Sequence, residues 1–257
     1  MTQSADILNG TKMKNALILH GADSNSKANW FPWLKLELEK RGYRVFAPNL
    51  PHSEVPDIKQ YKDCILSSGF SFGAKTILVG HSAGSVIILK LLETLPENVD
   101  TAILVGAFKD SRAWFKVLFG KPVTLEELRI RVNAGRELMK NHIHINLRKL
   151  FAKPFKFEKI KKRARKIIFI HSDDDPFCPL SGAKYLARKV GGELIVLPGQ
   201  KHFSVSTAGK EYIRFPFLLE LLDGITRKAV TAPSRHPSRS RSLRSRSWLR
   251  PKPKARR

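Results

Sequence analysis

The stretch TILVGHSAGSVIILKLLETL, residues 76–95, constrains the fold of this chain more than any other part of the sequence. Residues 76–79 form a short, continuous, apolar run, which is typical of a parallel strand buried on both faces. The apolar residues after Ala83 recur at helical spacing. The pentapeptide GHSAG, residues 80–84, therefore predicts a strand–turn–helix elbow, in which small residues allow close packing and the serine is held at the tip. Ser82 is the candidate nucleophile.

A serine hydroxyl is an effective nucleophile only when a base removes its proton and a carboxylate orients that base. Both partners follow along the chain. An apolar run at 167–170 leads into HSDDDPFCP, residues 171–179, and the strand-like ELIVLPG at 193–199 leads into QKHF, which contains His202. The order Ser, Asp, His, each just after a strand, is that of the α/β-hydrolase fold. Such strand ends line the crevice where open α/β sheets bind ligands.

Three adjacent aspartates compete for the role of the acid, and they cannot all point at one histidine or be buried together. Asp175 precedes Pro176, whose ring restricts it to extended geometry, a rigid presentation for orienting an imidazole. We predict Asp175 as the acid, with Asp174 as the alternative. Asp173 and Asp174 are then expected to be solvated loop acids that cap the following helix.

The alternation of strands and helices predicts a mostly parallel, doubly wound α/β sheet, formed by one domain at residues 13–226. The expected strands are 15–19, 43–47, 76–79, 101–105, 167–170 and 193–197. The expected helices are 30–41, 58–66, 83–95, 183–190 and 209–222.

Length and cysteine content fit a globular intracellular protein. A chain of 257 residues can bury roughly 70% of its unfolded surface in a single core. Its two cysteines, Cys64 and Cys178, imply no disulfide framework, and no run approaches the ~20 apolar residues of a membrane span. We expect a cytoplasmic location. Residues 1–12 are expected to be an N-terminal extension, with Met13 as an alternative start.

The net charge of +25 is concentrated in two segments. Residues 109–166 carry 18 basic and 5 acidic residues, and residues 227–257 carry 12 basic residues and no acid. The rest of the chain, which holds every triad candidate, is balanced. We expect the insert at 109–166 to be either a helical cap over the crevice or a peripheral packing element with a solvated basic face.

The tail at 227–257 is rich in Arg and Ser and cannot form a core, so it is expected to be disordered. Tails of this kind bind nucleic acid or anionic membrane through phosphate contacts. The alternatives are a solvated tail without specific function and a reading-frame artefact.

Several motifs together resemble the small α/β-hydrolase-fold serine hydrolases that include retinoblastoma-binding protein 9. They are LILHGADSNSKANWFPWLKLELEKRGYRVFAPNLP, VGHSAG, FEKIK, SDDDPFCP and ELIVLPGQKHF. The resemblance runs from about Met13 to Leu222. It implies a triad of Ser82, Asp175 and His202, with the acid directly before the proline of DPF, and hydrolysis of esters or amides without metal or organic cofactor. The chain departs from the family after Ala22 and before His202, where family members have more glycine.

The tetrahedral oxyanion of such a reaction needs backbone donors, for which we predict the N–H groups of Ala83, next to the nucleophile, and Ala22, after the first strand. Four aromatic residues are expected either to line an acyl pocket or to fill the core: Trp30, Trp33, Phe177 and Phe203.

The sequence thus favours a serine hydrolase, more narrowly a carboxylesterase on small or medium acyl esters. The alternative is an interaction protein with a hydrolase-fold scaffold, which binds nucleic acid or anionic surfaces through its basic insert and tail.

Overall fold

The computed structural model describes residues 13–111 and 147–231, with side chains described up to residue 225. The predicted N-terminal extension, the middle of the basic insert and most of the basic tail lie outside these residues. The chain divides into two compact units, Met1–Leu219 and Glu220–Arg257.

The core element is one parallel sheet of six strands in the order β2-β1-β3-β4-β5-β6. Neighbouring strands pair in parallel throughout, for example with Val79 opposite Ile103 and Ile103 opposite Ile168. The three inner strands β3, β4 and β5 are almost wholly buried, which explains their continuous apolar runs. The strands are β1 (Lys14–Leu19), β2 (Tyr43–Phe46), β3 (Thr76–His81), β4 (Val99–Val105), β5 (Ala164–Ser172) and β6 (Glu193–Leu197).

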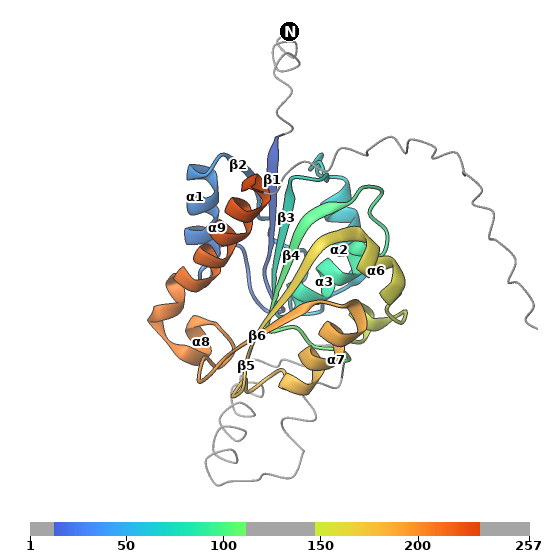
Figure 1. Ribbon diagram of the computed structural model, residues 1–257. Helices are drawn as coiled ribbons and strands as arrows, with labels where there is room; N and C mark the ends of the chain where they lie inside the picture. Colours follow the sequence, from blue (N-terminus) through green and yellow to red (C-terminus); the bar gives the residue numbers. More distant parts are fainter. Residues whose placement is uncertain (1–12, 112–146, 232–257) are drawn as a thin grey trace, which may run out of the picture. The chain divides into compact units, whose positions relative to one another are not determined.

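Helices of the first unit cover both faces of the sheet (Figure 1). Helix α1 packs on β1 and β2 on one face, while α2, α3, α6 and α7 lie on the other. The helices are α1 (Phe31–Lys40), α2 (Ile58–Leu66), α3 (Ala83–Leu92), α6 (Phe157–Arg163), α7 (Leu180–Val190), α8 (Val205–Ala208) and α9 (Pro216–Thr231), with short 3₁₀ turns at Leu147–Phe151 and Lys210–Ile213. No helix in the described part of the chain has the length and apolar character needed to cross a membrane.

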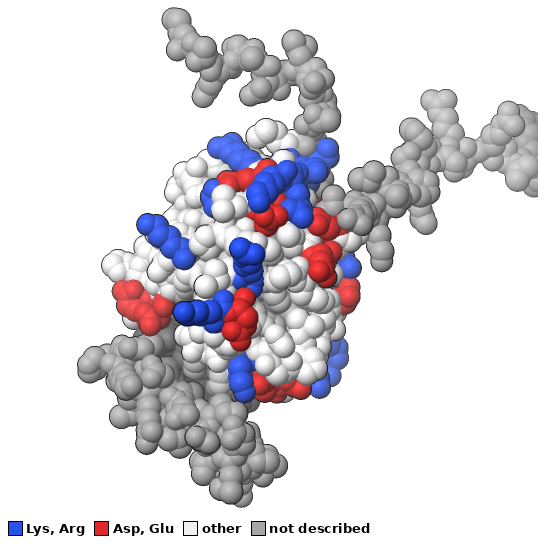
Figure 2. Space-filling view, turned by 90° about the vertical axis from the view of Figure 1, so that its left-hand side faces the viewer, with Lys and Arg blue, Asp and Glu red and all other residues white. Residues whose placement is uncertain are grey.

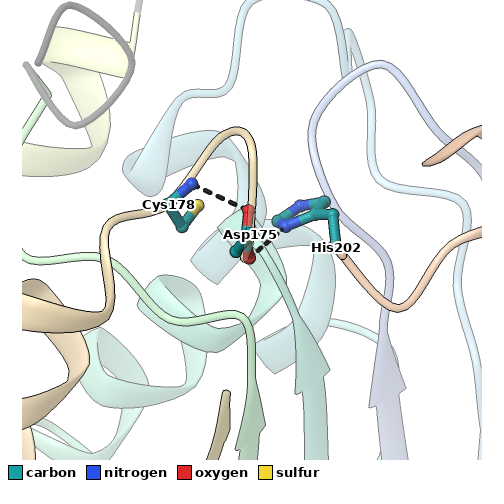
Figure 3. A group of neighbouring side chains, drawn as sticks. All are labelled: Asp175, Cys178 and His202. Carbon is teal, nitrogen blue, oxygen red and sulfur yellow. Dashed lines mark hydrogen bonds and ion pairs between the residues drawn. The ribbon is translucent and has the colours of Figure 1, made fainter. Parts of the chain in front are cut away.

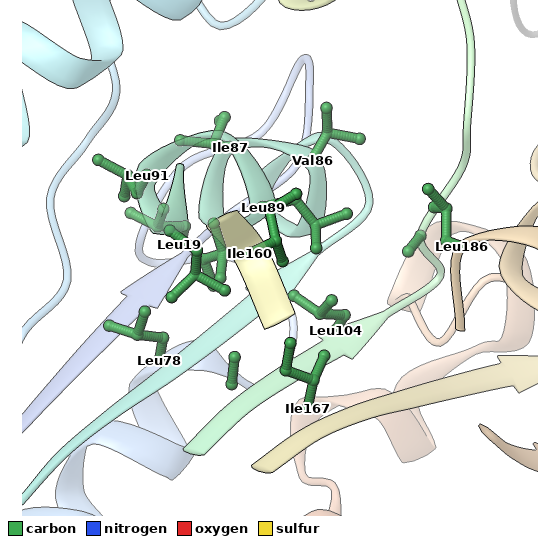
Figure 4. Close-up of a cluster of buried hydrophobic side chains, with 14 of the residues drawn as sticks. Leu19, Leu78, Val86, Ile87, Leu89, Leu91, Leu104, Ile160, Ile167 and Leu186 are labelled. Carbon is green, nitrogen blue, oxygen red and sulfur yellow. The ribbon is translucent and has the colours of Figure 1, made fainter. Parts of the chain in front are cut away.

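Helix α3 lies at the centre of the hydrophobic core, and all ten of its residues are buried. Leucine and isoleucine side chains of α3 pack against those of the inner strands, with Ile160 of α6 and Leu186 of α7 beside them (Figure 4). A helix this rich in apolar residues requires such a position, because it has no face for solvent. Its one charged residue, Lys90, is also buried and forms an ion pair with Glu93 at 3.0 Å. The elbow serine is therefore attached to a helix that is buried along its whole length.

Several predicted boundaries differ from those in the structure, and two of the differences have identifiable reasons. Strand β5 begins at Ala164 because Arg165 and Lys166 form ion pairs with Asp100 and Glu193 on the neighbouring strands, at 2.7 and 3.0 Å. Cross-strand pairs of this kind extend a strand beyond its apolar run.

The last predicted helix, 209–222, is two elements in the structure. Gly209 has φ 106°, which ends α8, and α9 begins only at Pro216, whose fixed φ suits the first helical position. Helix α9 continues to Thr231, past the predicted start of the tail at residue 227.

Candidate active site

Ser82 occupies a strained turn between β3 and α3. Its backbone has φ 53° and ψ −120°, a region that costs a residue with a Cβ about 1–3 kcal/mol. Two glycines make the turn possible: a Cβ on Gly80 would lie 2.6 Å from the backbone of Gly84, and one on Gly84 would lie 2.3 Å from the Leu19 oxygen. The spacing of the predicted elbow therefore follows from close contact of strand, helix and β1.

The elbow is fixed to the next strand by backbone bonds. Ser82 N–H donates to the Val105 oxygen at 2.8 Å, and the buried Ser85 hydroxyl donates to the oxygens of Gly80 and Val105 at 2.8 and 2.9 Å. These bonds hold the serine at the carboxyl end of the sheet, where the loops that follow β5 and β6 also lie.

Asp175 and His202 form a direct pair (Figure 3). Nδ1 of His202 donates to Oδ2 of Asp175 at 2.7 Å, and the two side chains are only 7% and 1% exposed. The other carboxylate oxygen, Oδ1, accepts the N–H groups of Phe177 and Cys178 at 2.8 and 2.9 Å. The carboxylate is therefore fixed from both sides. A proton on Nδ1 leaves Nε2 free as a base, which is the tautomer that triad chemistry requires.

The other two aspartates bind the loop after β6 and do not cap α7. Asp173 Oδ1 accepts the N–H of Gly199 at 2.9 Å, and Asp174 Oδ1 accepts the N–H of Lys201 at 2.8 Å. Asp174 Oδ2 also forms an ion pair with the Lys201 ammonium at 2.8 Å. Neither caps α7, which begins after Pro179 without a side-chain cap. The expectation that these acids cap the following helix was wrong, because the loop after β6 lies close enough to use both carboxylates. Asp173 is an exposed loop acid, as predicted, whereas Asp174 is partly buried.

The network around Asp174 perturbs its ionisation. Burial works against the charged form, but hydrogen bonds from Lys201 and Ser172 outweigh it and hold the pKa of Asp174 below its usual value. Asp174 therefore carries a stable negative charge next to the loop that contains His202.

His202 lies between two residues with left-handed backbones. Lys201 and Phe203 both have φ 53°, which is uncommon for residues with side chains. Trp30 Nε1 donates to the Phe203 oxygen at 3.0 Å, and the N–H of Val205 donates to Asn29 at 2.9 Å. These contacts hold a loop conformation that would otherwise relax.

Buried histidines at the ends of β3 and β5 support the two loops. His81 Nε2 donates to the His202 oxygen, and His171 Nε2 donates to the Cys178 oxygen, each at 2.8 Å. Burial lowers the pKa of His81 to about 3 and also lowers the pKa of His171. Both rings are neutral near pH 7, and their Nδ1 atoms have no hydrogen-bond partner among the described residues.

The loop after β1 lies against the elbow. A Cβ on Gly21 would be 3.0 Å from the Ser82 Cβ and 3.5 Å from its Oγ. His20 fixes this loop through its own Nδ1, which donates to the Gly21 oxygen at 2.8 Å, and its Nε2 accepts the Leu50 N–H at 2.9 Å. The predicted oxyanion donors Ala22 and Ala83 thus follow directly on residues that contact each other, Gly21 and Ser82.

Sequence reasoning missed Gly106, which follows β4. Its φ is 62°, and a Cβ there would lie 3.2 Å from Cε1 of His202 and 3.4 Å from Nδ1. Gly106 N–H donates to the Ile170 oxygen, which keeps it beside the histidine. A glycine directly after a buried strand that ends at the level of the elbow was the only available signal.

The four aromatic residues were expected either to line an acyl pocket or to fill the core, and the structure places them differently. Trp30 and Phe203 are completely buried and pack with Phe215, so they fill the core. Phe177 is half-buried, and its ring edge faces the ring of His202 at 5.1 Å. Trp33 is half-buried on α1.

The structure therefore brings Asp175 and His202 into contact. Ser82 lies in the same region, because His81, directly before it, bonds to the His202 oxygen. Gly106 borders the His202 ring and follows the residue that accepts the Ser82 N–H. Within the described residues, no hydrogen bond joins the Ser82 hydroxyl to His202. In substrate-free sites such bonds are often long and tighten when substrate binds.

Comparison with known proteins gives the class. A family model described as serine hydrolase matches residues 16–223, and the chain belongs to this family. Putative hydrolase YdeN of Bacillus subtilis (strain 168) is 27% identical over 192 residues, which cover 74% of this chain and 86% of YdeN. Serine hydrolase RBBP9 of Rattus norvegicus is 24% identical over 196 residues, which cover 76% of this chain and 88% of that protein.

Solved structures agree on the fold. The crystal structure of the B. subtilis ydeN gene product matches with a TM-score of 0.66 and 25% identity, covering 84% of this chain and 100% of that one. A carboxylesterase structure from Nitrososphaera gargenis matches with a TM-score of 0.58 and 18% identity, covering 84% and 92%. The chain has the α/β-hydrolase fold, and the predictions of family and fold are confirmed.

Proposed function

We propose that this serine hydrolase cleaves carboxylic esters of small or medium acyl groups with a Ser82–His202–Asp175 triad. The observation that carries the proposal is the buried Asp175–His202 pair, which leaves Nε2 of the histidine free to accept a proton. The strained backbone of Ser82 at the turn between β3 and α3 supports this serine as the nucleophile. The free thiols of Cys64 and Cys178 support a reducing, cytoplasmic location.

In the proposed reaction, Ser82 Oγ attacks the acyl carbon while His202 Nε2 takes the hydroxyl proton. Asp175 stabilises the resulting imidazolium. The oxyanion accepts the N–H groups of Ala22 and Ala83, which have no other partner among the described residues. The C–O bond to the leaving group then breaks, and His202 returns the proton to the departing oxygen. Water hydrolyses the acyl-enzyme by the same steps.

Ser82→Ala should lower the turnover of p-nitrophenyl esters by roughly 10⁴-fold or more and abolish labelling by a fluorophosphonate probe, which reacts only with an activated serine. Ser181→Ala is the control, because Ser181 is exposed on α7. Near wild-type turnover or labelling of Ser82→Ala would exclude the proposed nucleophile.

A second candidate function is binding of polyanions, favoured by an open groove of about 650 Å³ between α6 and α7. Only Lys161 among the groove cations has a carboxylate partner in the described part of the chain, Glu158 at 3.0 Å. By contrast, Lys and Arg lie next to Asp and Glu on the α1 side (Figure 2), as in the Lys40–Glu37 pair. The groove is lined by Lys156, Phe157, Glu158, Lys159, Lys161, Arg188 and Lys189.

We propose single-stranded nucleic acid as the occupant, bound with help from the tail. The exposed large apolar residues, which a membrane surface would need, lie outside α6 and α7. A concave basic groove with a partly exposed phenylalanine suits a flexible phosphate backbone with unstacked bases.

The test compares the full-length protein with a quadruple glutamine variant at Lys156, Lys159, Arg188 and Lys189, using a labelled oligouridylate. Removing four phosphate contacts should flatten the slope of log K against log salt by up to ~3. A matched variant with glutamine at exposed Lys27, Lys59, Lys75 and Lys210 should keep the slope. Equal slopes for both variants, or no binding at about 50 mM salt, would reject the groove as the site.

A further inference from the structure

A third polar group adjoins the Asp175–His202 pair, the thiol of Cys178 (Figure 3). One ligand atom from each of these three residues lies within 4.8 Å of the other two, and all three residues are buried. A nitrogen, an oxygen and a sulfur donor in one compact group are the ligand types that bind zinc. The triad chemistry proposed above uses the Cys178 backbone N–H to hold Asp175 but gives the Cys178 thiol no task.

The surroundings hold these donors in place. Asp175 Oδ1 is occupied by the N–H groups of Phe177 and Cys178, so only Oδ2 is available for a new contact. The Cys178 backbone is fixed a second time, because its oxygen accepts Nε2–H of His171 at 2.8 Å. Supporting hydrogen bonds of this kind orient ligands in metal sites.

We propose that Asp175, Cys178 and His202 form an inhibitory site for a thiophilic divalent cation such as Zn²⁺. The ion takes the place of the proton between His202 Nδ1 and Asp175 Oδ2, with the Cys178 sulfur as the third ligand. Zn–N and Zn–O bonds of about 2 Å and a Zn–S bond of about 2.3 Å require shifts of about an ångström from the present positions.

Counting protons and charge explains why binding would inhibit. The Nδ1 proton moves to Nε2, so the imidazole remains neutral, and the thiol proton leaves to solvent. A carboxylate, a thiolate and a divalent cation sum to zero charge, which suits a buried site. Nε2 now carries a proton and cannot accept that of Ser82, so the base is blocked. The inhibitory effect rests on the proposed triad, whereas the metal site itself does not.

The experiment measures ester hydrolysis by the full-length protein in chelator-free buffer with increasing ZnCl₂, with MgCl₂ as the control ion. Wild-type activity should fall and should return when EDTA is added. Cys178→Ser and Cys178→Ala, each scaled to its own uninhibited rate, should need roughly ten-fold more zinc or higher for half inhibition. Cys64→Ser is the matched control, because Cys64 lies on α2 away from this group, and it should respond like wild type.

A second readout needs no activity. Titration with Co²⁺ should give a thiolate-to-cobalt charge-transfer band in wild type and in Cys64→Ser, but not in the Cys178 variants. Equal zinc sensitivity of all variants, or the same band in a Cys178 variant, would overturn the site. A band without loss of activity would overturn its inhibitory role. A band in a wild-type protein that hydrolyses no ester would support the site and count against the proposed function.

Discussion

The two sides of the site are built in opposite ways. On the side that holds the base, the loops after β5 and β6 are joined by Asp173, Asp174 and Asp175, and each of these carboxylates accepts a bond. On the oxyanion side, the backbone is fixed one residue away from the predicted donor, by Asp23 N–H to the Ser53 oxygen at 2.8 Å. The carboxylates around the proposed base are bonded to neighbouring loops, whereas the N–H groups of the predicted oxyanion donors, Ala22 and Ala83, have no partner among the described residues.

This difference follows from what each side must do. A base works only in one orientation and one tautomer, so fixing it before substrate arrives lowers the barrier. An oxyanion donor that is already bonded would have to break that bond during the reaction. Variants on the fully bonded side should therefore lose turnover in proportion to how directly they touch His202.

The largest effect is expected for Asp175→Asn. Loss of the carboxylate removes the partner that fixes the His202 tautomer, so kcat should fall by up to ~10⁴. Asp173→Asn should stay within a few-fold, because among the described residues the Asp173 side chain bonds to the Gly199 N–H and not to His202 or its neighbours. Steady-state kinetics on a p-nitrophenyl ester measure both. If Asp175→Asn kept its activity and Asp174→Asn lost it, the triad acid would be Asp174 and the assignment of Asp175 would be wrong.

A smaller effect is expected for Gly106→Ala. The new methyl group would lie 3.2 Å from Cε1 of His202. The alanine backbone would also have to adopt φ 62°, which is unfavourable for a residue with a Cβ. A displacement of the base by about 1 Å costs on the order of 10² in rate. We expect kcat to fall by that factor while KM changes little. Gly191→Ala is the control, because it has the same kind of strain at the end of α7 but open space around it.

Asp174→Ala should lower kcat by roughly ten-fold, since Asp174 reaches His202 indirectly, through the N–H and the ammonium of Lys201. Asp174→Glu keeps the charge and should recover part of the loss. If Asp174 had a purely structural role, Asp174→Ala would have a lower thermal midpoint than wild type. The two variants would then have the same kcat at a temperature where both are folded.

Lowering the pH should have the smallest effect on activity but a clear effect on the free energy of unfolding. Burial lowers the pKa of His20, His81 and His171. At acidic pH these histidines therefore bind protons in the unfolded chain but remain neutral in the folded chain. The free energy of unfolding should be highest above the unfolded pKa of about 6.5 and fall as the pH drops toward 3. Each histidine contributes a slope of up to about 1.4 kcal/mol per pH unit.

Urea unfolding at pH 7.5, 6 and 5 measures this slope. His81→Asn should remove one histidine's share of it. A free energy of unfolding that does not change across these three values would contradict the assignment of neutral, buried rings.

The sequence predicted the parts of the fold and site that depend on local chemistry. Continuous apolar runs gave all six strands, and the glycines around Ser82 gave the elbow, because both features act within a few residues. Asp175, which the sequence favoured because it precedes Pro176, lies in contact with His202 in the structure, and its role as the acid stays a prediction. The roles of Asp174 and Gly106 could not be predicted, because they depend on which loops meet at the edge of the sheet, and contacts of residues 27 or 96 positions apart leave no local pattern.

The strand order has a consequence for synthesis. From β3 to β6 the strands lie side by side in chain order, so these four strands of the sheet can be added one after another as the chain leaves the ribosome. The elbow serine is made with the third strand, the acid follows the fifth, and the histidine follows the sixth, at the edge. A partly synthesised chain thus carries a serine without its base. In the proposed mechanism, hydrolysis begins only once the sheet is complete, and the first turnover reports that folding has finished.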